Sequence, residues 1–289
     1  MSDKPRVNVF YGGFSSERSV SLETGKNVGK ALQKLGYPVK FVDVKPEFPD
    51  SPYGLDCDLA YIALHGEFGE DGGIQEVLES ADLPFTGSSA AASRLALDKV
   101  QAQRLFAFNG IPVPPSHSAR GTEEVLALAD GISNFPVIVK PAREGSTYGI
   151  SVVRKPTQLR PALETALKYD ELVLVEKFIQ GREFTVGLVG SRALPVLEVV
   201  PSSEIFDFAA KYRDQATYSF EHGLAEELEN SLMEYSLRAA SIANCEGISR
   251  ADLMVSEEGE AFFLEINTVP GMTGHSLVPM AATRVGIPF

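Results

Sequence analysis

The alternation of strand and helix patterns over the first 87 residues constrains the fold more than any other feature of the chain. Apolar runs typical of strands and helical patterns follow one another at 7–11, about 19–35, 39–44, 59–64 and from about 74. Strands and helices in this order form a parallel sheet whose strands are joined by crossover helices. We therefore expect residues 1–87 to fold as a small parallel α/β domain.

The rest of the chain does not keep this alternation. Residues 88 to about 110 have a helical pattern, in which Asp98 is well placed to begin a second helix as its N-cap. From about residue 135 several strand patterns follow one another, and FPVIVKPAREGSTYGISVV predicts an antiparallel hairpin. One long helix is expected over about 225–244. This half is therefore expected to be α+β, and we divide the chain into 1–87, 88–184 and 185–289.

The composition excludes some classes of protein. The chain has 289 residues, is 44% hydrophobic and carries a formal net charge of −13. Such a chain lacks the basic surface that nucleic acid requires, although a few lysines in a cleft can still attract a small anion. No apolar run is long enough to span a membrane, and MSDKPRVNVFYGG lacks the apolar core of a signal peptide. With two cysteines and no CxxC motif, we expect a cytoplasmic protein whose partners include neither nucleic acid nor membrane.

Two strand patterns near the C-terminus, SRADLMV and AFFLEIN, predict a hairpin that turns within SEEGE. A turn of even length pairs Asp252 with Phe263, and paired residues point to the same face. The same count pairs Arg250 with Glu265. A turn of odd length would remove this arrangement, and the sequence leaves both possibilities open. The polar residues expected on one face are Arg250, Asp252, Glu265 and Asn267.

These side chains have the chemistry of a metal site. The carboxylates of Asp252 and Glu265 would repel one another unless a cation lay between them. Carboxylate and amide oxygens are the hard ligands that Mg²⁺ prefers. An exposed polar sheet face is the alternative, and it is less favoured for Glu265 and Asn267 because Pro270-Gly271 and a polar loop follow at once. For Asp252 both interpretations stay open.

A magnesium site suggests a phosphate-binding loop, but neither common type is present. The chain has no Gly-Lys-Ser/Thr and no Gly-x-Gly. The segment KPAREGSTYG, residues 140–149, supplies Lys140 at a strand end and a loop whose backbone N–H groups can wrap phosphate oxygens. A glycine hairpin turn is the commoner meaning of such a segment. Combined with the metal face, it indicates a nucleotide site.

Together these segments resemble the ATP-grasp superfamily and, more closely, the D-alanine–D-alanine ligase family. The resemblance runs in order from about residue 7 to residue 286, through YGGFSSERSVSL, LHGEFGEDGGIQ, LPFTGSS, LDKVQAQ, VIVKPAREGSTYGISVV, VEKFIQGREFTV, AKY and FLEINTVPGMTGHSLVPMAA. It implies an ATP-grasp fold: a substrate domain at 1–87, a central subdomain at 88–184, and a C-terminal subdomain with a lid and metal site at 185–289. Ser19 departs from the family, which usually has Glu there.

The resemblance implies a set of residues around ATP. Lys99 and Lys140 would contact its phosphates. Glu176, Lys177 and Ile179 would hold adenine, and Glu183 would hold the ribose. Two Mg²⁺ ions, for which Mn²⁺ can substitute, would be bound by Asp252, Glu265 and Asn267.

The resemblance also implies residues around two D-alanine molecules. Glu17 would hold the ammonium group of the first, with His65 nearby. Arg250 and the backbone of Gly271 would form an oxyanion hole. The carboxylate of the second D-alanine would be held by Ser276 and Leu277. In the segment expected to be a mobile lid, Lys211 and Tyr212 would cover the site, and Tyr212 would join Ser146 and Glu17 in a hydrogen-bonded link.

The implied activity is the ATP-dependent joining of two D-alanines through a D-alanyl phosphate, for peptidoglycan precursors, by a homodimer. Tyr212 favours an amine acceptor, because ligases that make D-alanyl-D-lactate typically have Phe at the matching position. Two rivals remain. One is another carboxylate–amine ligase of the superfamily, and the other is a nucleotide-binding protein without turnover.

Several residues also have simpler interpretations. Glu17 can serve a helix N-terminus, and Lys99 can be a solvated residue of a first helical turn. His65 can be a loop histidine satisfied by backbone, and His275 is taken as structural. Ser146 can be a turn hydroxyl. The segment around Lys211 and Tyr212 can be ordinary surface.

Overall fold

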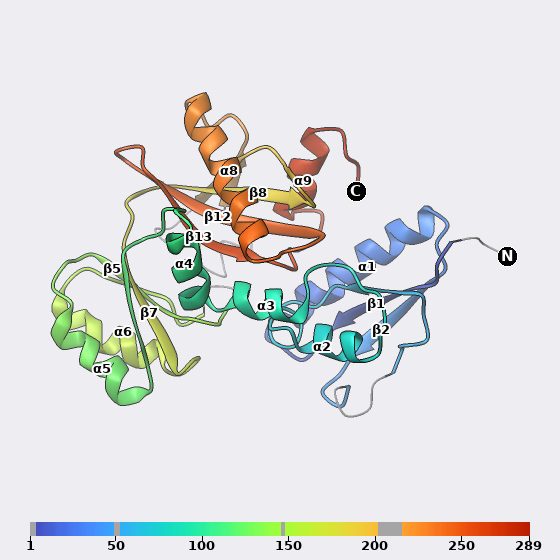
Figure 1. Ribbon diagram of the computed structural model, residues 1–289, viewed down its shortest axis with the longest axis horizontal. Coiled ribbons are helices and arrows are strands. Elements are labelled where there is room, and N and C mark those ends of the chain that lie inside the picture. Colours follow the sequence, from blue (N-terminus) through green and yellow to red (C-terminus); the bar gives the residue numbers. More distant parts are fainter. Residues whose placement is uncertain (1–3, 49–52, 146–147, 202–215) are drawn as a thin grey trace.

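The structure is a computed structural model, and it describes residues 4–48, 53–145, 148–201 and 216–289. Within these ranges the strands form three sheets, each in its own lobe of the molecule (Figure 1). Helices α3 and α4 run between the lobes, close to the centre of the view. No helix in the described ranges is long and apolar enough to cross a membrane.

The N-terminal lobe is a parallel sheet in the order β2-β1-β3. Both pairings of the central strand β1 are parallel, and α1 packs on β1 and β2. The parallel α/β lobe predicted from the alternation is therefore confirmed. Its elements are β1 (Val7–Gly12), α1 (Arg18–Lys34), β2 (Val39–Val44), β3 (Leu59–Ile62) and α2 (Gly73–Ser80).

Two glycines allow α1 to lie directly on this sheet. A Cβ atom at Gly25 would come within 2.4 Å of the Tyr11 side chain, and one at Gly29 within 2.3 Å of the Phe41 ring. Any larger residue would push the helix away from the sheet. The same face of α1 buries the hydroxyl residues Ser21 and Thr24.

The segment after this lobe is helical, as predicted, and it breaks at Asp98. The side chain of Asp98 accepts a hydrogen bond from the backbone N–H of Gln101 at 3.0 Å, which caps the second helix. Lys99, the first residue of that helix, is buried. The two helices are α3 (Ala90–Leu97) and α4 (Lys99–Phe108).

The second lobe is an antiparallel sheet in the order β4-β7-β5-β6, packed against α5 and α6. Val125, Val139, Leu163 and Val175 form part of its core. The predicted hairpin around KPAREGSTYG is the β5–β6 pair. The elements are β4 (Ser116–Arg120), α5 (Thr122–Gly131), β5 (Val137–Pro141), β6 (Ser151–Val153), η1 (Pro156–Gln158), α6 (Leu159–Ala166) and β7 (Leu172–Lys177).

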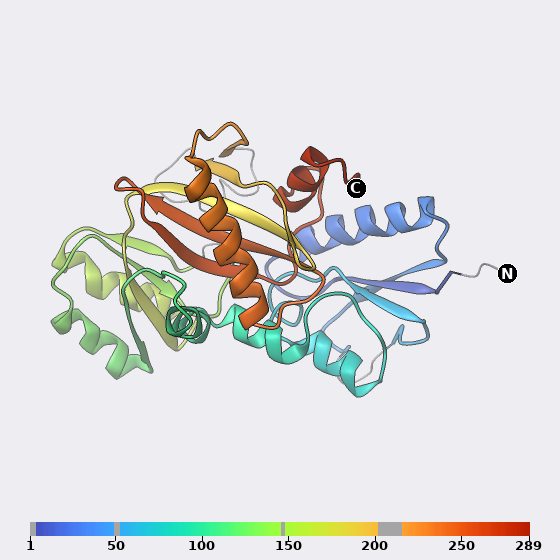
Figure 2. The same ribbon diagram turned by 45° about the horizontal axis from the view of Figure 1, so that its top comes forward.

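The third lobe is an antiparallel sheet in the order β11-β10-β8-β12-β13, with β9 beside β8. Helix α8 crosses one face of this sheet (Figure 2), and Phe106 of α4 packs edge-on against Phe263. Residue 184, the boundary suggested by the sequence, lies inside β8, and the chain passes between sheets at 178–180. The elements are β8 (Gly181–Val189), β9 (Arg192–Ala193), β10 (Leu197–Pro201), β11 (Ala216–Ser219), α8 (Glu226–Ile242), β12 (Ile248–Ser256), β13 (Ala261–Asn267) and α9 (Leu277–Arg284).

The register predicted for the β12–β13 hairpin is wrong. The structure pairs Arg250 with Asn267, and Asp252 with Glu265. The predicted partner of Asp252, Phe263, pairs with the next residue along β12 instead. The four polar residues nevertheless project from one face, because each pair lies directly across the ladder.

The predicted register is wrong because the hairpin has two irregularities, a turn of odd length and a β-bulge, and the bulge compensates for the turn. The turn is odd, with Gly259 at φ +82° and its N–H donating to the carbonyl of Ser256 at 3.0 Å. Such a turn alone would place Glu265 on the face opposite Asp252. A β-bulge at this point leaves Leu264 as an extra residue of β13, and this returns Glu265 to the side of Asp252.

Candidate active site

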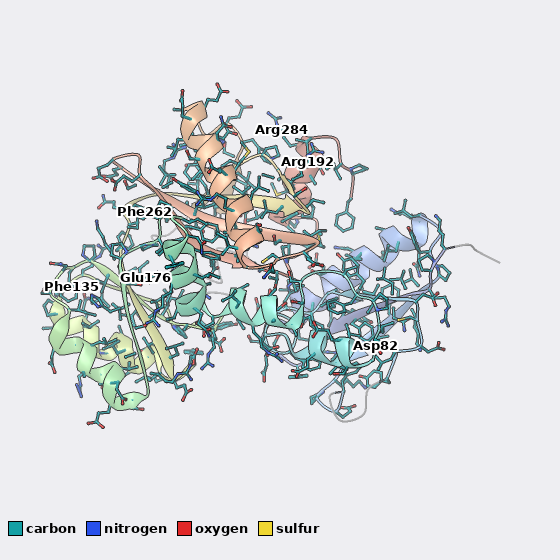
Figure 3. All side chains as sticks on the ribbon, viewed as in Figure 1. Asp82, Phe135, Glu176, Arg192, Phe262 and Arg284 are labelled. Carbon is teal, nitrogen blue, oxygen red and sulfur yellow. The ribbon has the colours of Figure 1, made fainter. Side chains whose placement is uncertain are left out.

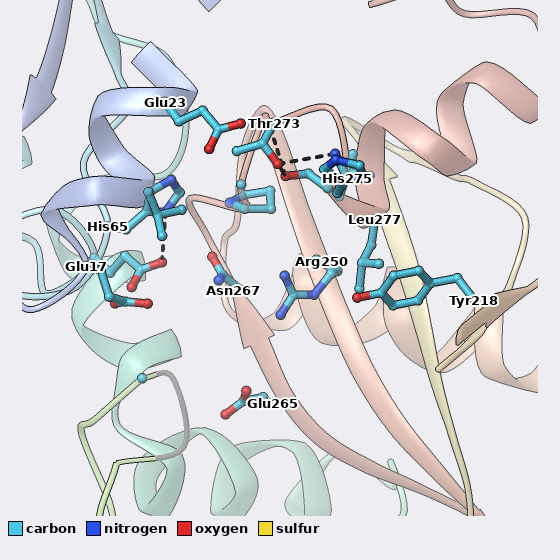
Figure 4. A pocket seen from close by; sticks show the side chains of 17 residues that line it. Glu17, Glu23, His65, Tyr218, Arg250, Glu265, Asn267, Thr273, His275 and Leu277 are labelled. Atoms are coloured by element: carbon cyan, nitrogen blue, oxygen red, sulfur yellow. Dashed lines mark hydrogen bonds and ion pairs between the residues drawn. The ribbon is translucent and has the colours of Figure 1, made fainter. Parts of the chain in front are cut away.

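A cavity of about 210 Å³ lies between the N-terminal lobe and the third sheet (Figure 4). Its walls come from the start of α1, the segment after β3, strands β12 and β13, and the loop before α9. Residues from both ends of the chain therefore meet at one point. The predicted site residues that line the cavity are Glu17, His65, Arg250, Glu265, Asn267, Gly271, Ser276 and Leu277.

The carboxylate of Asp252 is buried and fully engaged by neighbouring donors. Arg250 donates to it through Nε at 2.9 Å and through Nη2 at 2.7 Å. The hydroxyl of Thr185, on the adjacent strand β8, donates to Oδ1 at 2.7 Å. These bonds fix the direction of both Asp252 and the Arg250 guanidinium, whose head points into the cavity in Figure 4.

The carboxylate of Glu265 is paired with the ammonium group of Lys99, Oε2 to Nζ, at 3.1 Å. Lys99 also donates to the carbonyl oxygen of Glu144 at 2.9 Å. Burial alone would lower the pKa of Lys99, but the carboxylates of Glu265, Glu176 and Glu70 together outweigh burial and hold that pKa above its ordinary value. Lys99 is therefore a buried, charged residue rather than a solvated one.

The oxygen atoms of Asp252, Glu265 and Asn267 have the chemistry that a site for Mg²⁺ requires. Asp252 and Glu265 face each other across the hairpin, and Asn267 follows on the same face. The Asn267 side-chain oxygen accepts the N–H of Val269 at 2.8 Å, which holds it at the cavity wall. Two carboxylates, each balanced by a cationic side chain, and one amide oxygen are consistent with hard divalent ions.

A second buried ion pair lies deeper between the second and third sheets. Lys140 Nζ and Glu176 Oε2 are 2.6 Å apart, and both side chains are almost inaccessible. Gln103 of α4 donates from Nε2 to Glu176 and also to the carbonyl of Leu264, the bulge residue, at 3.1 Å. Figure 3 shows Glu176 beside α4. The side-chain amide of Gln103 thus connects Glu176 of the second sheet with the β-bulge of β13.

The remaining residues expected around adenine and ribose lie where the chain passes from one sheet to the other. Lys177 ends β7 and is exposed, whereas Ile179 in the connection is buried. Glu183 lies on β8 and is half-buried. A nucleotide bound at this connection would lie between the two sheets.

Glu17 precedes α1 and is buried, with 7% of its surface exposed. It is the N-cap residue of α1, although its side chain forms no capping hydrogen bond with the helix. Gly66 and Gly145 approach it closely: a Cβ atom at Gly66 would lie 2.8 Å from Glu17 Oε2. The carboxylate therefore occupies a tight pocket at the cavity wall.

His65 is buried, and both its ring and its backbone have partners. Its Nε2 lies 3.0 Å from the hydroxyl of Thr24, and its Nδ1 lies 3.9 Å from Glu70. The backbone N–H of His65 donates to Ser21 Oγ at 2.9 Å, and the Ser15 hydroxyl donates to the backbone carbonyl of His65 at 2.7 Å. His65 thus combines backbone satisfaction with a place at the cavity wall.

The loop before α9 is held by neutral hydrogen bonds. Ser276 Oγ accepts the N–H of Thr273 at 2.8 Å and lies 2.9 Å from the Thr273 hydroxyl. A Cβ atom at Gly271 would approach Ser276 Oγ within 2.9 Å, so the backbone at Gly271 passes very near that hydroxyl. The loop presents small groups and backbone to the cavity.

Comparisons with known proteins agree with this geometry. A family model described as "D-ala D-ala ligase C-terminus" matches residues 105–289. The D-alanine–D-alanine ligase of Geobacter sulfurreducens is 43% identical over 98% of this chain and 90% of its own length. The ligase of Syntrophotalea carbinolica is 41% identical over 98% of this chain and 92% of its own. The chain belongs to the D-alanine–D-alanine ligase family.

Solved structures of the D-alanine–D-alanine ligase family have the same fold. The ligase from Bacillus anthracis, complexed with ATP, has a TM-score of 0.84 at 30% identity and covers 98% of this chain and 93% of that one. The VanG D-Ala:D-Ser ligase from Enterococcus faecalis has a TM-score of 0.86 at 27% identity, over 99% and 96% of the two chains. The chain thus has the ATP-grasp fold, with a parallel α/β lobe before it.

Three residues expected from the ligase family, Ser146, Lys211 and Tyr212, lie outside the described residues. Other residues at the site were missed. Glu70, Tyr218 and His275 line the cavity, the last of them having been taken as structural. Thr24, Gln103 and Thr185 contact predicted residues from behind. Their hydroxyl and amide groups carry no local pattern in the sequence, because their partners are remote along the chain.

Proposed function

We propose that the chain ligates two D-alanines to D-alanyl-D-alanine at the expense of ATP, through a D-alanyl phosphate. The observation that carries this proposal is the lining of the cavity. A buried carboxylate, an arginine, oxygen ligands of a metal type and a loop of small residues face one space. Membership of a family whose relatives are named D-alanine–D-alanine ligases supports it.

In the first step a carboxylate oxygen of one D-alanine attacks the γ-phosphorus of ATP, and ADP leaves. Lys99 and Lys140 neutralise phosphate charge, while Glu176, Lys177, Ile179 and Glu183 hold the nucleoside. Mg²⁺, or Mn²⁺ in its place, stabilises charge on the phosphoryl group when bound. The residues that would hold two such ions are Asp252, Glu265 and Asn267.

In the second step the free amine of the other D-alanine attacks the acyl carbon. The tetrahedral intermediate carries an oxyanion, which Arg250 and the backbone N–H of Gly271 stabilise. Collapse forms the amide, and phosphate leaves with the former carboxylate oxygen while the amine loses a proton. Glu17 holds the ammonium of the first D-alanine beside His65. Ser276 and Leu277 receive the carboxylate of the second.

Water must be kept from the acyl phosphate. We assign this task to the lid residues Lys211 and Tyr212, with Ser146 and Glu17 linked to the latter, on the strength of the family resemblance. The dipeptide would serve peptidoglycan precursor synthesis in a bacterial cytoplasm. A homodimer, with no nucleic acid or membrane partner, completes the proposal.

The test is phosphate release from ATP and Mg²⁺ with D-alanine, beside L-alanine and no amino acid. Chromatography of the products identifies the dipeptide. D-lactate and D-serine, each added with D-alanine, test the acceptor, since one structural neighbour is a D-Ala:D-Ser ligase. Release only with D-alanine, matched by dipeptide, is expected. Equal release in every tube, with ATP still bound, would favour a nucleotide-binding protein without turnover.

A further inference from the structure

One buried hydroxyl joins the two walls of the cavity. Thr24 lies on α1, and only 1% of its surface is exposed. Its Oγ1 accepts the backbone N–H of Met272 at 3.2 Å and lies 3.0 Å from His65 Nε2. Met272 is 248 residues away in sequence. A single atom of the N-terminal lobe therefore contacts both His65 and the loop before α9.

The direction of one of these hydrogen bonds follows from the chemistry of the groups. The backbone N–H of Met272 can only donate, so it uses a lone pair of the Thr24 hydroxyl oxygen. The Thr24 hydroxyl donates to His65 Nε2 when that nitrogen carries no proton, and it accepts from Nε2–H in the other tautomer. The hydroxyl therefore keeps both contacts in either tautomer of His65.

This arrangement fixes one peptide plane at the cavity wall. The N–H of Met272 belongs to the same peptide group as the carbonyl of Gly271, so holding that N–H fixes this peptide plane. The plane that carries the Gly271 N–H is joined to it directly through the Gly271 Cα. Asn27, almost one helical turn further along α1, donates to the Met272 carbonyl at 3.3 Å and gives the loop a second hydrogen bond to the same helix. Gly271 and His65 both line the cavity, whereas Thr24 and Asn27 do not.

We propose that Thr24 is a positioning residue for the second reactant: through its hydroxyl it sets the Gly271–Met272 peptide and the His65 ring relative to each other. This rests on the proposed ligase function. Loss of the hydroxyl leaves the buried ion pairs of Lys99 and Lys140 untouched. Transfer of the phosphoryl group then continues, while attack of the amine becomes slow and water competes for the acyl phosphate.

The test compares Thr24→Val, which keeps the shape and removes the hydroxyl, with Thr24→Ser, which restores the hydroxyl. Dipeptide formation by Thr24→Val should fall about tenfold, as expected for two lost hydrogen bonds at a reacting site. Phosphate release should fall less, so the ratio of phosphate to dipeptide rises above the wild-type ratio. Thr24→Ser should restore the ratio. Thr165→Val, a helical threonine on α6 that donates to the Pro161 carbonyl, is the matched control and should leave it unchanged.

A ratio unchanged in Thr24→Val, or equally raised in Thr24→Ser, would overturn the proposal. Thr24→Ala removes the same hydroxyl and serves if the valine variant does not fold. Hydrogen–deuterium exchange of peptides covering residues 268–277 gives a readout independent of catalysis. We expect Thr24→Val to exchange faster than the wild type in these peptides and Thr24→Ser to exchange like the wild type. Equal exchange in the two variants would contradict the proposed contact between Thr24 and the loop. Should the wild type make no dipeptide, the ligase proposal fails, while the exchange result still decides whether Thr24 holds the loop.

Discussion

The floor and the loop wall of the cavity are held together in different ways. By the floor we mean three ion pairs at or behind the cavity wall: Lys99 with Glu265, Lys140 with Glu176, and Arg250 with Asp252. Of these residues, Arg250 and Glu265 line the cavity itself. By the loop wall we mean residues 270–276, which are tied by hydroxyl and amide groups. Each charged side chain of the floor is paired with one of opposite charge, whereas the hydrogen bonds that hold the loop wall join uncharged groups.

This difference suggests how each region works. In the proposed ligase, the lysines of the floor would exchange a carboxylate for phosphate oxygens, and Glu265 would exchange its lysine for a metal ion. ATP and metal together would then enter without leaving a buried lysine unpaired. Neutral hydrogen bonds in the loop wall are individually weaker, at about 1 kcal/mol each, so this wall can adjust to a substrate at small cost.

The largest effect is expected from Lys140→Met in the floor. It leaves the Glu176 carboxylate buried without its cation, and the free energy of unfolding should fall by about 3–5 kcal/mol. Phosphate release should fall about 1000-fold, because a phosphate-neutralising group is lost. Urea denaturation and phosphate assays measure the two effects.

The double variant Lys140→Met/Glu176→Leu separates these effects. It removes the unpaired charge and should recover most of the stability, while activity stays low. If the double variant regained activity, Lys140 would have only a structural role and the floor would not be a phosphate site.

The second effect concerns the metal ligands. Glu265→Gln keeps the size of the side chain and removes its charge, and phosphate release should fall about 100-fold. Raising the Mg²⁺ concentration should restore part of the loss. Glu260→Gln, exposed in the turn of the same hairpin, is the control and should behave as wild type. Equal activity of both variants at every Mg²⁺ concentration would exclude Glu265 as a ligand.

A smaller effect is expected in the loop wall. Ser276→Ala removes the acceptor for Thr273 and the proposed contact with a substrate carboxylate. The KM for the second D-alanine should rise about tenfold, with KM for ATP unchanged. Steady-state kinetics at varied D-alanine and ATP measure both. Ser231→Ala on α8, which loses only a bond to the Glu227 carbonyl, is the control. A rise in KM for ATP alone would contradict the separation of the two regions.

The smallest effect on activity is expected at Asp170, whose ion pair with Arg143 lies outside the floor and can be tested by pH. Burial raises the pKa of Asp170, but hydrogen bonds from Arg143 and from the Leu172 N–H outweigh it and leave that pKa below its ordinary value. Since the folded pKa is lowered, its stabilisation is complete above the unfolded pKa of about 3.9 and is lost as pH falls through the folded value. The difference in unfolding free energy between wild type and Asp170→Asn should shrink as pH is lowered from 6 to 3. A difference that grows with acid would contradict this sign.

Local patterns were sufficient for most elements and for the shared face of Glu265 and Asn267. Strand periodicity placed Val39–Val44, and the capping chemistry of Asp98 placed the start of α4. The alternation Glu265-x-Asn267 put both side chains on one face. Each of these features depends on neighbours within a few residues, so the sequence contains them directly.

Contacts between remote segments could not be predicted from patterns. The turn and the bulge of the β12–β13 hairpin each shift the register by one residue, and only the pair restores the shared face. The burial of Lys99 depends on Glu265, and the role of Thr24 depends on Met272. No local periodicity encodes such partners, because packing between lobes selects them.

The most direct test of the central claim follows one oxygen atom. D-alanine labelled with ¹⁸O in its carboxylate is incubated with the chain, ATP and Mg²⁺, and the released phosphate is examined by mass spectrometry. An acyl phosphate intermediate transfers one labelled oxygen to each phosphate that accompanies a dipeptide, and this is the result we predict. Phosphate without the label, in step with dipeptide formation, would contradict the assignment of this cavity to carboxylate activation.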